Sequence, residues 1–115
     1  MSNPEATCAT HDHEDDPRSI PFDATSCQHA AAIFSALGDP NRLRLLGLLV
    51  QREMCVTEIA TALDDNLPAI SQRLKLLRGE RIVNYRREGK HVVYSLDDEH
   101  IVELIRNAVA HADHR

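Results

Sequence analysis

Apolar side chains recur three or four residues apart in five segments of the chain, as they do in helices that bury one face. Residues that favour helix starts come before two of these segments, with Asp39 ahead of Pro40 and Asn66 at a polar joint. Gly38 and Gly79 stand where helices are expected to stop. The pattern therefore predicts helices over residues 25–37, 40–50, 56–63, 67–78 and 98–114.

Each of the first four predicted helices has a stripe of apolar residues that we expect to face inward. On the second helix, Arg42 and Arg44 fall outside this stripe and are expected to stay in solvent. The last helix is apolar over a wider arc than one contact on so small a body needs, so we expect it to pack or to dimerise. The four inward stripes are Ala30, Ile33, Phe34 and Leu37; Leu43, Leu46 and Leu49 or Val50; Ile59, Ala60 and Leu63; and Ile70, Leu74 and Leu77.

Two strand-like runs, residues 81–85 and 91–96, follow the fourth helix. They are joined by residues 86–90, which have the length and the glycine of a hairpin loop. The two helices before them, joined by a short polar turn, form a helix-turn-helix, and a basic hairpin directly after such a unit is a wing. The expected fold is therefore mainly α with a small β-hairpin, a winged helix-turn-helix.

The chain has 115 residues, 43% of them apolar, which suits one compact domain. It has no apolar run near ~20 residues and no basic start followed by an apolar stretch, so we expect neither a membrane span nor a secretory signal and place the protein in the cytoplasm. Cys8, Cys27 and Cys55 are odd in number and irregularly spaced, which predicts free thiols instead of a disulfide framework. Two Phe, two Tyr and no Trp are too few for a platform that stacks single-stranded nucleic acid.

Charge is unevenly distributed along the chain. Residues 1–24 carry six acidic side chains, one arginine, three prolines and few apolar residues, so we expect a flexible acidic tail before a domain at residues 25–115. Residues 71–91 carry seven basic and two acidic side chains. A basic face on an otherwise neutral body favours a polyanion partner such as double-stranded DNA, although charge alone also fits an ordinary solvated surface.

The helix at 67–78 presents side chains that suit base edges and phosphates on the face away from its apolar stripe. Glutamine can address adenine, arginine or lysine can address guanine, and wing cations suit phosphates or the minor groove. The alternative is an amphipathic helix with a merely solvated face, which the adjacent wing disfavours. The candidate DNA-binding residues are Ser71, Gln72, Arg73, Lys75 and Arg78 on the helix and Arg86, Arg87 and Lys90 on the wing.

Four residues of metal-ligand type fall on one face of the last predicted helix: Asp98, His100, His111 and His114. His100 and His111 are about 16 Å apart along a helix axis, so one zinc ion with bonds of ~2.1 Å cannot bind both within one helix. If two such helices pair antiparallel about a two-fold axis, the first two residues of one chain meet the last two of the other, which gives two equivalent sites. One carboxylate oxygen and three imidazole nitrogens suit Zn(II) and can bind Co(II); the alternative is a set of solvated terminal histidines.

Four segments resemble the ArsR/SmtB family of metal-sensing winged-helix repressors: ALGDPNRLRLL at 36–46, EMCV at 53–56, AISQRL at 69–74 and REGKHVVY at 87–94. The resemblance covers residues 28–114, and the spacing of the four C-terminal residues is similar to that in the zinc site of the family's zinc and cobalt sensors. It implies a homodimer that binds operator DNA without metal and releases it when metal binds. The antiparallel pairing of the last helices is implied in the same way.

Some members of this family have a second metal site between the N-terminal tail and the short third helix. Cys55 matches its first cysteine, and Glu58 stands where zinc-sensing relatives can have a carboxylate ligand. Thr57 stands where cadmium, lead and arsenic sensors carry another cysteine, which disfavours Cd(II) and a thiolate site without excluding Cu(I) or Ag(I). The tail's share of the site would come from Cys8, His11 and His13 of the other chain.

Two other functions fit part of the sequence. A repressor that responds to thiol oxidation, to sulfide, or to Cu(I) or Ag(I) would use Cys8, Cys27 and Cys55 as its switch. A winged-helix protein with purely structural zinc would lose stability, and not DNA affinity, when its metal is removed. A zinc hydrolase is disfavoured because the chain has no His-Glu-x-x-His pattern, so we do not expect an enzyme.

Overall fold

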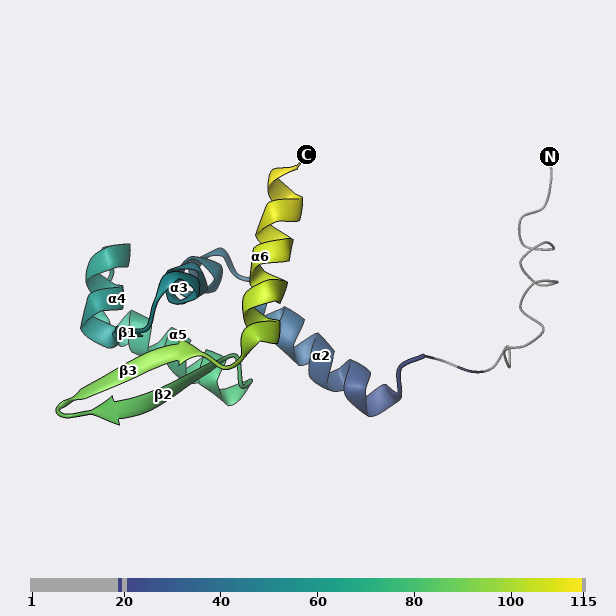
Figure 1. Cartoon of the computed structure of the whole chain (residues 1–115), viewed down its shortest axis with the longest axis horizontal. Coiled ribbons are helices and arrows are strands. Elements are labelled where there is room, and N and C mark those ends of the chain that lie inside the picture. Colours follow the sequence, from purple (N-terminus) through teal and green to yellow (C-terminus); the bar gives the residue numbers. More distant parts are fainter. Residues whose placement is uncertain (1–18, 20, 115) are drawn as a thin grey trace.

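The computed structural model describes residue 19 and residues 21–114, and this part of the chain forms five helices and three strands (Figure 1). Residues 1–18 and 20 of the expected acidic tail lie outside it, so the flexibility of that tail stays a prediction. The expected fold, a mainly helical winged helix-turn-helix, is confirmed. The elements are α2 (Ala24–Leu37), α3 (Pro40–Gln51), β1 (Met54–Cys55), α4 (Val56–Leu63), α5 (Leu67–Gly79), β2 (Val83–Glu88), β3 (His91–Leu96) and α6 (Glu99–Asp113).

Short polar side chains fix the starts of four helices. Each accepts a hydrogen bond from a backbone N–H in the first turn, which satisfies a donor that the helix itself leaves unpaired. The predicted caps Asp39 and Asn66 are confirmed. The four pairs are Asp23 with Ser26 (2.7 Å), Asp39 with Arg42 (3.0 Å), Asn66 with Ala69 (2.9 Å) and Asp98 with Ile101 (3.1 Å).

Arg42, at the start of α3, forms hydrogen bonds within the protein. Arg42 Nε donates to the carbonyl oxygen of Ala36 at 2.6 Å, and its Nη2 donates to that of Ser35 at 3.3 Å. These carbonyls belong to the last turn of α2, where helices leave acceptors without partners. The expectation that Arg42 stays free in solvent was wrong, because it ties the end of α2 to the start of α3.

The three strands form one antiparallel sheet in the order β1-β3-β2. The hairpin is longer than the sequence predicted, since β2 continues to Glu88 and the turn needs only two residues, with Gly89 at a φ of 63°. Arg81, expected to begin the strand, stands before it in the left-handed region at a φ of 59°. β1, which pairs Cys55 with Val93, was not predicted because two residues are too few to show an alternating pattern.

The hydrophobic core lies between α3, α4, α5 and the sheet, and it also includes Ile101 and Ile105 of α6. The predicted core residues of α4 and α5 are confirmed, apart from the half-buried Leu63. On α3 the predicted Leu46 and Leu49 are buried, but Leu45 completes the buried face in place of Leu43, which is only half-buried. α2 buries only Ala36 and Leu37 at its end, so Phe34 is 60% exposed in the single chain. The buried residues of the two helix-turn-helix helices are Ile59, Ala60, Ile70, Leu74 and Leu77.

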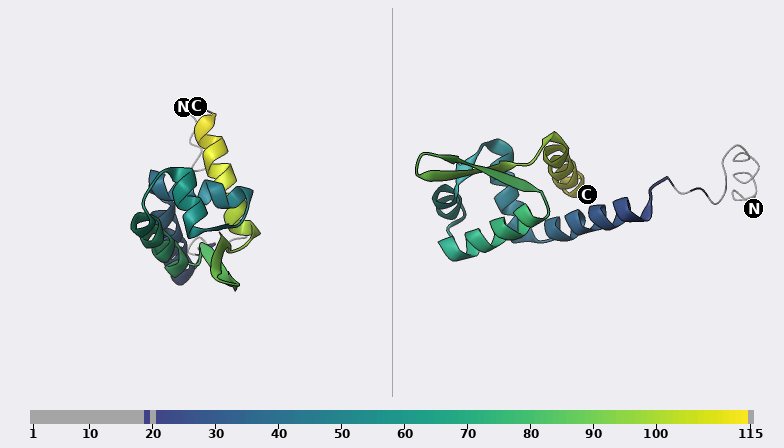
Figure 2. Two further views of the ribbon diagram at one scale, coloured as in Figure 1. Left: turned by 90° about the vertical axis from the view of Figure 1, so that its left-hand side faces the viewer. Right: turned by 90° about the horizontal axis from the view of Figure 1, so that it is seen from below.

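The two terminal helices project from this body (Figure 1). The hairpin extends on one side and α2 on the other, while α6 rises from the body in a third direction, and Figure 2 shows the same arrangement from two further sides. Within the described part of the chain, no helix is both long and apolar enough to cross a membrane. The helix-turn-helix and the hairpin are therefore built on one core, with the terminal helices extending beyond it.

Candidate DNA-binding face and metal centre

α5 presents a polar outer face beyond its buried stripe. Ser71, Gln72 and Lys75 are exposed on this helix. α4 is followed by its C-cap Asp64, in the left-handed region with a φ of 53°, and Asn66 is the N-cap of α5, so the two helices are joined by a tight turn. This is the arrangement in which the second helix of a helix-turn-helix enters a DNA major groove.

Arg73 is held by the turn before its own helix. Its Nη2 lies 3.0 Å from Asp65 Oδ2, and its side chain is only 21% exposed. A hydrogen bond from the backbone N–H of Asn66 (2.8 Å), assisted by Arg73, lowers the pKa of the Asp65 carboxyl. The contact between Arg73 and Asp65 therefore stabilises the turn that joins α4 to α5.

Arg78, in the last turn of α5, lies against the wing. Its guanidinium carbon is 4.1 Å from the centre of the Tyr85 ring on β2, which is a cation–π distance. The Tyr85 ring in turn lies 5.8 Å from the Tyr94 ring on β3. These two side-chain contacts connect the end of α5 with both strands of the hairpin.

The wing cations have different surroundings. Arg86 donates from Nη1 to Glu53 Oε2 at 2.7 Å and from Nη2 to Glu88 Oε2 at 2.8 Å, and these hydrogen bonds raise its pKa. Arg87 and Lys90 are exposed, and within residues 21–114 no ion pair is formed by either. The contact between Glu53 and Arg86 was not predicted, because the two residues are 33 positions apart in the sequence.

The four candidate zinc ligands lie at the two ends of α6. Asp98 Oδ1 caps the helix, and Asp98 Oδ2 lies 3.7 Å from His100 Nδ1. His111 and His114 are in the last turn and at the C-cap, and every residue from 106 to 114 is exposed. In the described part of one chain, no three metal-ligating side chains come close enough to hold an ion. Within a single chain, the candidate ligands therefore lie in two groups at opposite ends of α6.

The start of α6 is joined to the connection between α5 and β2. The backbone N–H of Asp97 donates to the carbonyl oxygen of Ile82 at 3.0 Å. A cavity of about 630 Å³ separates this region from α2, and its lining includes Asp98, His100, Arg81 and His29. No pattern in the sequence points to His29, because only the fold brings α2 to this cavity.

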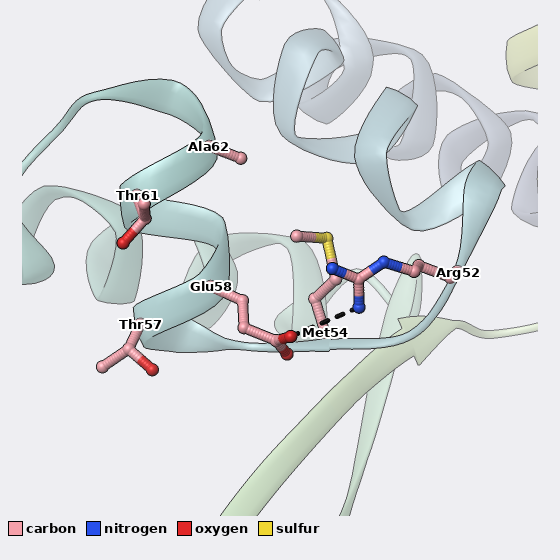
Figure 3. A pocket seen from close by; sticks show the side chains of 6 residues that line it. All are labelled: Arg52, Met54, Thr57, Glu58, Thr61 and Ala62. Carbon is pink, nitrogen blue, oxygen red and sulfur yellow. Dashed lines mark hydrogen bonds and ion pairs between the residues drawn. The ribbon is translucent and has the colours of Figure 1, made fainter.

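In the second candidate metal site, Cys55 and Glu58 already form contacts within the protein. Glu58 Oε1 accepts a hydrogen bond from the backbone N–H of Cys55 at 2.9 Å, and Glu58 Oε2 pairs with Arg52 at 3.3 Å beside a cavity of about 410 Å³ (Figure 3). The bonds from Cys55, followed by that from Arg52, lower the pKa of Glu58. Cys55 Sγ lies 3.1 Å from Thr57 Oγ1. The other candidate ligands, Cys8, His11 and His13, lie outside the described residues.

Comparison with known proteins identifies the family. The chain is 45% identical over 84 residues to a transcriptional repressor SmtB homolog from Synechocystis, a match covering 73% of this chain and 64%, just under two thirds, of that protein. It is 39% identical over 82 residues to a cadmium resistance transcriptional regulatory protein CadC homolog from Staphylococcus aureus, covering 70% of this chain and 68% of that protein. Residues 39–85 match the model of the arsR family of bacterial regulatory proteins. The chain belongs to the ArsR family.

The fold of this ArsR-family chain also matches a solved relative. It superposes with a TM-score of 0.76 and 32% identity on the homodimeric winged helix-turn-helix DNA-binding domain of a possible ArsR-family transcriptional regulator from Mycobacterium bovis. The match covers 85% of this chain and 91% of that one. Because the ArsR family consists of DNA-binding regulators, the expectation that the chain is not an enzyme is confirmed by its membership.

Proposed function

We propose that this chain is a metal-responsive transcriptional repressor. Its zinc-free homodimer binds operator DNA, and Zn(II) binding at sites shared between two copies of α6 releases the DNA. The class of function is supported by the relatives, an SmtB repressor homolog and a cadmium resistance regulator homolog. The observation that carries the proposal is the separation of the four candidate ligands into two exposed pairs at opposite ends of one helix.

The donor atoms fit zinc. Asp98 uses Oδ1 to cap α6, which leaves Oδ2 on the side of His100. Together with His111 and His114 from a second copy, the set is one carboxylate oxygen and three imidazole nitrogens, which suits a closed tetrahedral Zn(II) site. When bound, the ion would supply a rigid link between subunits, and Co(II) can use the same ligands.

Exposed apolar surface on the terminal helices supports the homodimer. Phe34 on α2 is 60% exposed and Val109 on α6 is 46% exposed. Large apolar side chains on neighbouring projecting helices are costly to leave in water and mark contact surfaces. Pairing of α6 with a second α6 would bury Val109 and bring the ligand pairs together.

A backbone hydrogen bond connects the proposed metal site with the elements that bind DNA. Asp97, next to the ligand Asp98, is hydrogen-bonded to Ile82, which stands between α5 and β2. A change in the angle of α6 is therefore passed to the joint that sets the recognition helix against the wing. A coupling of roughly 1–3 kcal/mol would change DNA affinity about 5- to 150-fold.

The thiol-responsive alternative would use Cys8, Cys27 and Cys55, of which Cys27 and Cys55 are free and Cys8 lies outside the described residues. Cys27 and Cys55 belong to different elements, α2 and β1, and Cys55 contacts Thr57. Release of DNA by an oxidant in the presence of a zinc chelator would favour this alternative, as would release by Cu(I) or Ag(I) in a variant without the α6 ligands.

Subunit mixing tests whether the zinc site is shared. One variant replaces Asp98 and His100 with alanine, the other replaces His111 and His114, and zinc content is measured by competition with a chromophoric chelator. Each variant alone should bind no zinc at this site. After equal mixing and exchange of subunits, half of the dimers carry one intact site, so about one quarter of the wild-type zinc content should return. No recovery in mixtures shown to contain heterodimers would contradict a shared site.

A further inference from the structure

Arg86 and Arg87 are neighbours on β2, yet only one of them is engaged by carboxylates. Successive side chains of a strand point to opposite faces of the sheet. On one face, the guanidinium of Arg86 forms hydrogen bonds with Glu53 at 2.7 Å and Glu88 at 2.8 Å. On the other, Arg87 is exposed and forms no ion pair within the described residues. The two arginines therefore have different surroundings although they are adjacent in the sequence.

The charge around Arg86 disfavours a DNA phosphate. One cation is matched by two carboxylates within hydrogen-bond distance, so the local group carries a net negative charge. A phosphate that approached Arg86 would be repelled by both carboxylates, and it would have to replace two charge-assisted hydrogen bonds. Arg86 is thus a weak site for a polyanion in spite of its charge.

The position of Arg86 gives it another role. In the sheet, Arg86 on β2 is paired with Val93 on β3, and Val93 is paired with Cys55 on β1. Arg86 reaches across β3 to Glu53, two residues before Cys55 and directly before the strand that leads into α4. This contact ties the outer strand of the wing to the chain that begins the helix-turn-helix.

Arg73 makes a similar contact at the other end of the unit. It pairs with Asp65 at 3.0 Å, and the exposed fractions of the two side chains are only 21% and 32%. Asp65 lies in the turn between α4 and α5, so this contact fixes the turn against the recognition helix. Lys75, two residues after Arg73, is exposed and forms no ion pair in the described part of the chain.

We propose that Arg73 and Arg86 are positioning residues that set the recognition helix and the wing, whereas Lys75, Arg87 and Lys90 bind DNA phosphates. The proposal rests on the DNA-binding function proposed above. It divides the basic face into cations that the protein uses internally and cations that neutralise the nucleic acid.

The salt dependence of duplex binding separates the two groups. Binding of zinc-free Arg86→Gln and Arg87→Gln dimers to a labelled duplex from upstream of the gene is measured over a series of salt concentrations. Each lost phosphate contact should reduce the slope of log K against log salt by about 0.9, so Arg87→Gln should reduce it by about 1.8 per dimer. Arg86→Gln should keep the wild-type slope and lose affinity by roughly two- to fivefold per subunit, as expected for one exposed ion pair.

Glu53→Gln provides the second variant. If Arg86 positions the wing, Glu53→Gln weakens binding at an unchanged slope, and the double variant is no weaker than Arg86→Gln alone, which already lacks the contact with Glu53. If Arg86 instead binds phosphate, Glu53→Gln frees it and strengthens binding, and Arg86→Gln lowers the slope as Arg87→Gln does; that result overturns the proposal. Circular dichroism of the free dimers shows that the fold is retained. A wild type that binds no duplex at any salt concentration would instead overturn the proposed function, and this assignment with it.

Discussion

Asp98 has two carboxylate oxygens, and capping of α6 uses only Oδ1. Asparagine caps helices as well as aspartate does but lacks the anionic oxygen that would bind zinc. Asp98→Asn should therefore leave the free energy of unfolding within about 0.5 kcal/mol of wild type. It should weaken zinc binding by at least the roughly 10- to 100-fold that is typical when a metal ligand loses an outer partner.

Chemical denaturation and chelator competition measure these two effects separately. Asp98→Ala is the control that loses both roles, and it should lower the free energy of unfolding by about 1 kcal/mol because the cap is lost. Wild-type zinc affinity in Asp98→Asn would show that this carboxylate is not a ligand.

Asp65 makes the stability of the helix-turn-helix depend on pH. A hydrogen bond from Asn66 and the ion pair with Arg73 lower the pKa of Asp65 in the folded state. Its stabilising contribution is therefore complete above the unfolded pKa and is lost as the pH falls through the lower folded pKa. Asp65→Asn should destabilise the protein at pH 7, and the difference from wild type should shrink as the pH is lowered below about 4.

Urea denaturation at a series of pH values tests this dependence. Asp64→Asn removes one negative charge from the same turn and keeps a residue that tolerates a φ of 53°, so it is the matched control. The assigned interaction would be contradicted if the difference in free energy of unfolding between Asp65→Asn and wild type stayed constant from neutral pH down to pH 3.

Residues that act locally could be read from the sequence, and those with distant partners could not. Asp39 and Asn66 were predicted as caps because a cap bonds to a backbone only three residues away. Arg86 was predicted to bind DNA from its charge alone, since nothing in the sequence reveals that Glu53, 33 positions earlier, lies beside it. The candidate ligands on α6 could be proposed from the sequence because their spacing along a helix is itself informative, and metal binding by them stays a prediction.

At the scale of elements, helices were predicted well because their apolar period and their stop signals are local. The predicted helix at 56–63 and α4 (Val56–Leu63) coincide, and α5 ends at the predicted glycine. The exposed half of α2 was not predicted, because periodicity shows which face is apolar but not whether anything in the same chain covers it. β1 and the full length of the hairpin depended on pairing between strands, which short segments do not encode.

Two glycines of the chain lie in different backbone environments, one in a turn and one inside a helix. Gly89 has a φ of +63°, which strains a side chain, whereas Gly47 lies inside α3, where an added Cβ would meet nothing within 4 Å. Gly89→Ala should lower the free energy of unfolding by about 1 kcal/mol. Gly47→Ala should raise it by about 0.5–1 kcal/mol, because alanine is the better helix former.

Thermal and urea denaturation of the two variants provide the measurement. We expect the same replacement of glycine by alanine to lower the free energy of unfolding at position 89 and to raise it at position 47. Destabilisation by both would show that the methyl group at Gly47 meets an interface, such as that of the dimer.

At the scale of the whole molecule, the exposed apolar side chains of α2 and α6 predict a homodimer. Val109 is 46% exposed, and Val109→Asp would place a charge where we expect the two copies of α6 to meet. Sedimentation should then show a monomer at concentrations where wild type is a dimer. Operator affinity should fall by roughly 100-fold or more, because two linked recognition helices bind far more tightly than one.

Lys75→Glu is the reciprocal control for this variant. It changes an exposed side chain of α5, so it should lose DNA affinity while remaining a dimer. A Val109→Asp protein that remains dimeric would place the subunit interface elsewhere.

The most direct test of the metal-responsive repressor is fluorescence anisotropy of a labelled duplex from upstream of its own gene, bound by reduced, zinc-free protein and titrated with Zn(II) and then with chelator. We predict that zinc releases the DNA, that chelator restores binding, and that replacement of His100 or His111 abolishes the release. DNA that stays bound at saturating zinc would contradict the proposed function, and would leave the α6 site with a structural role.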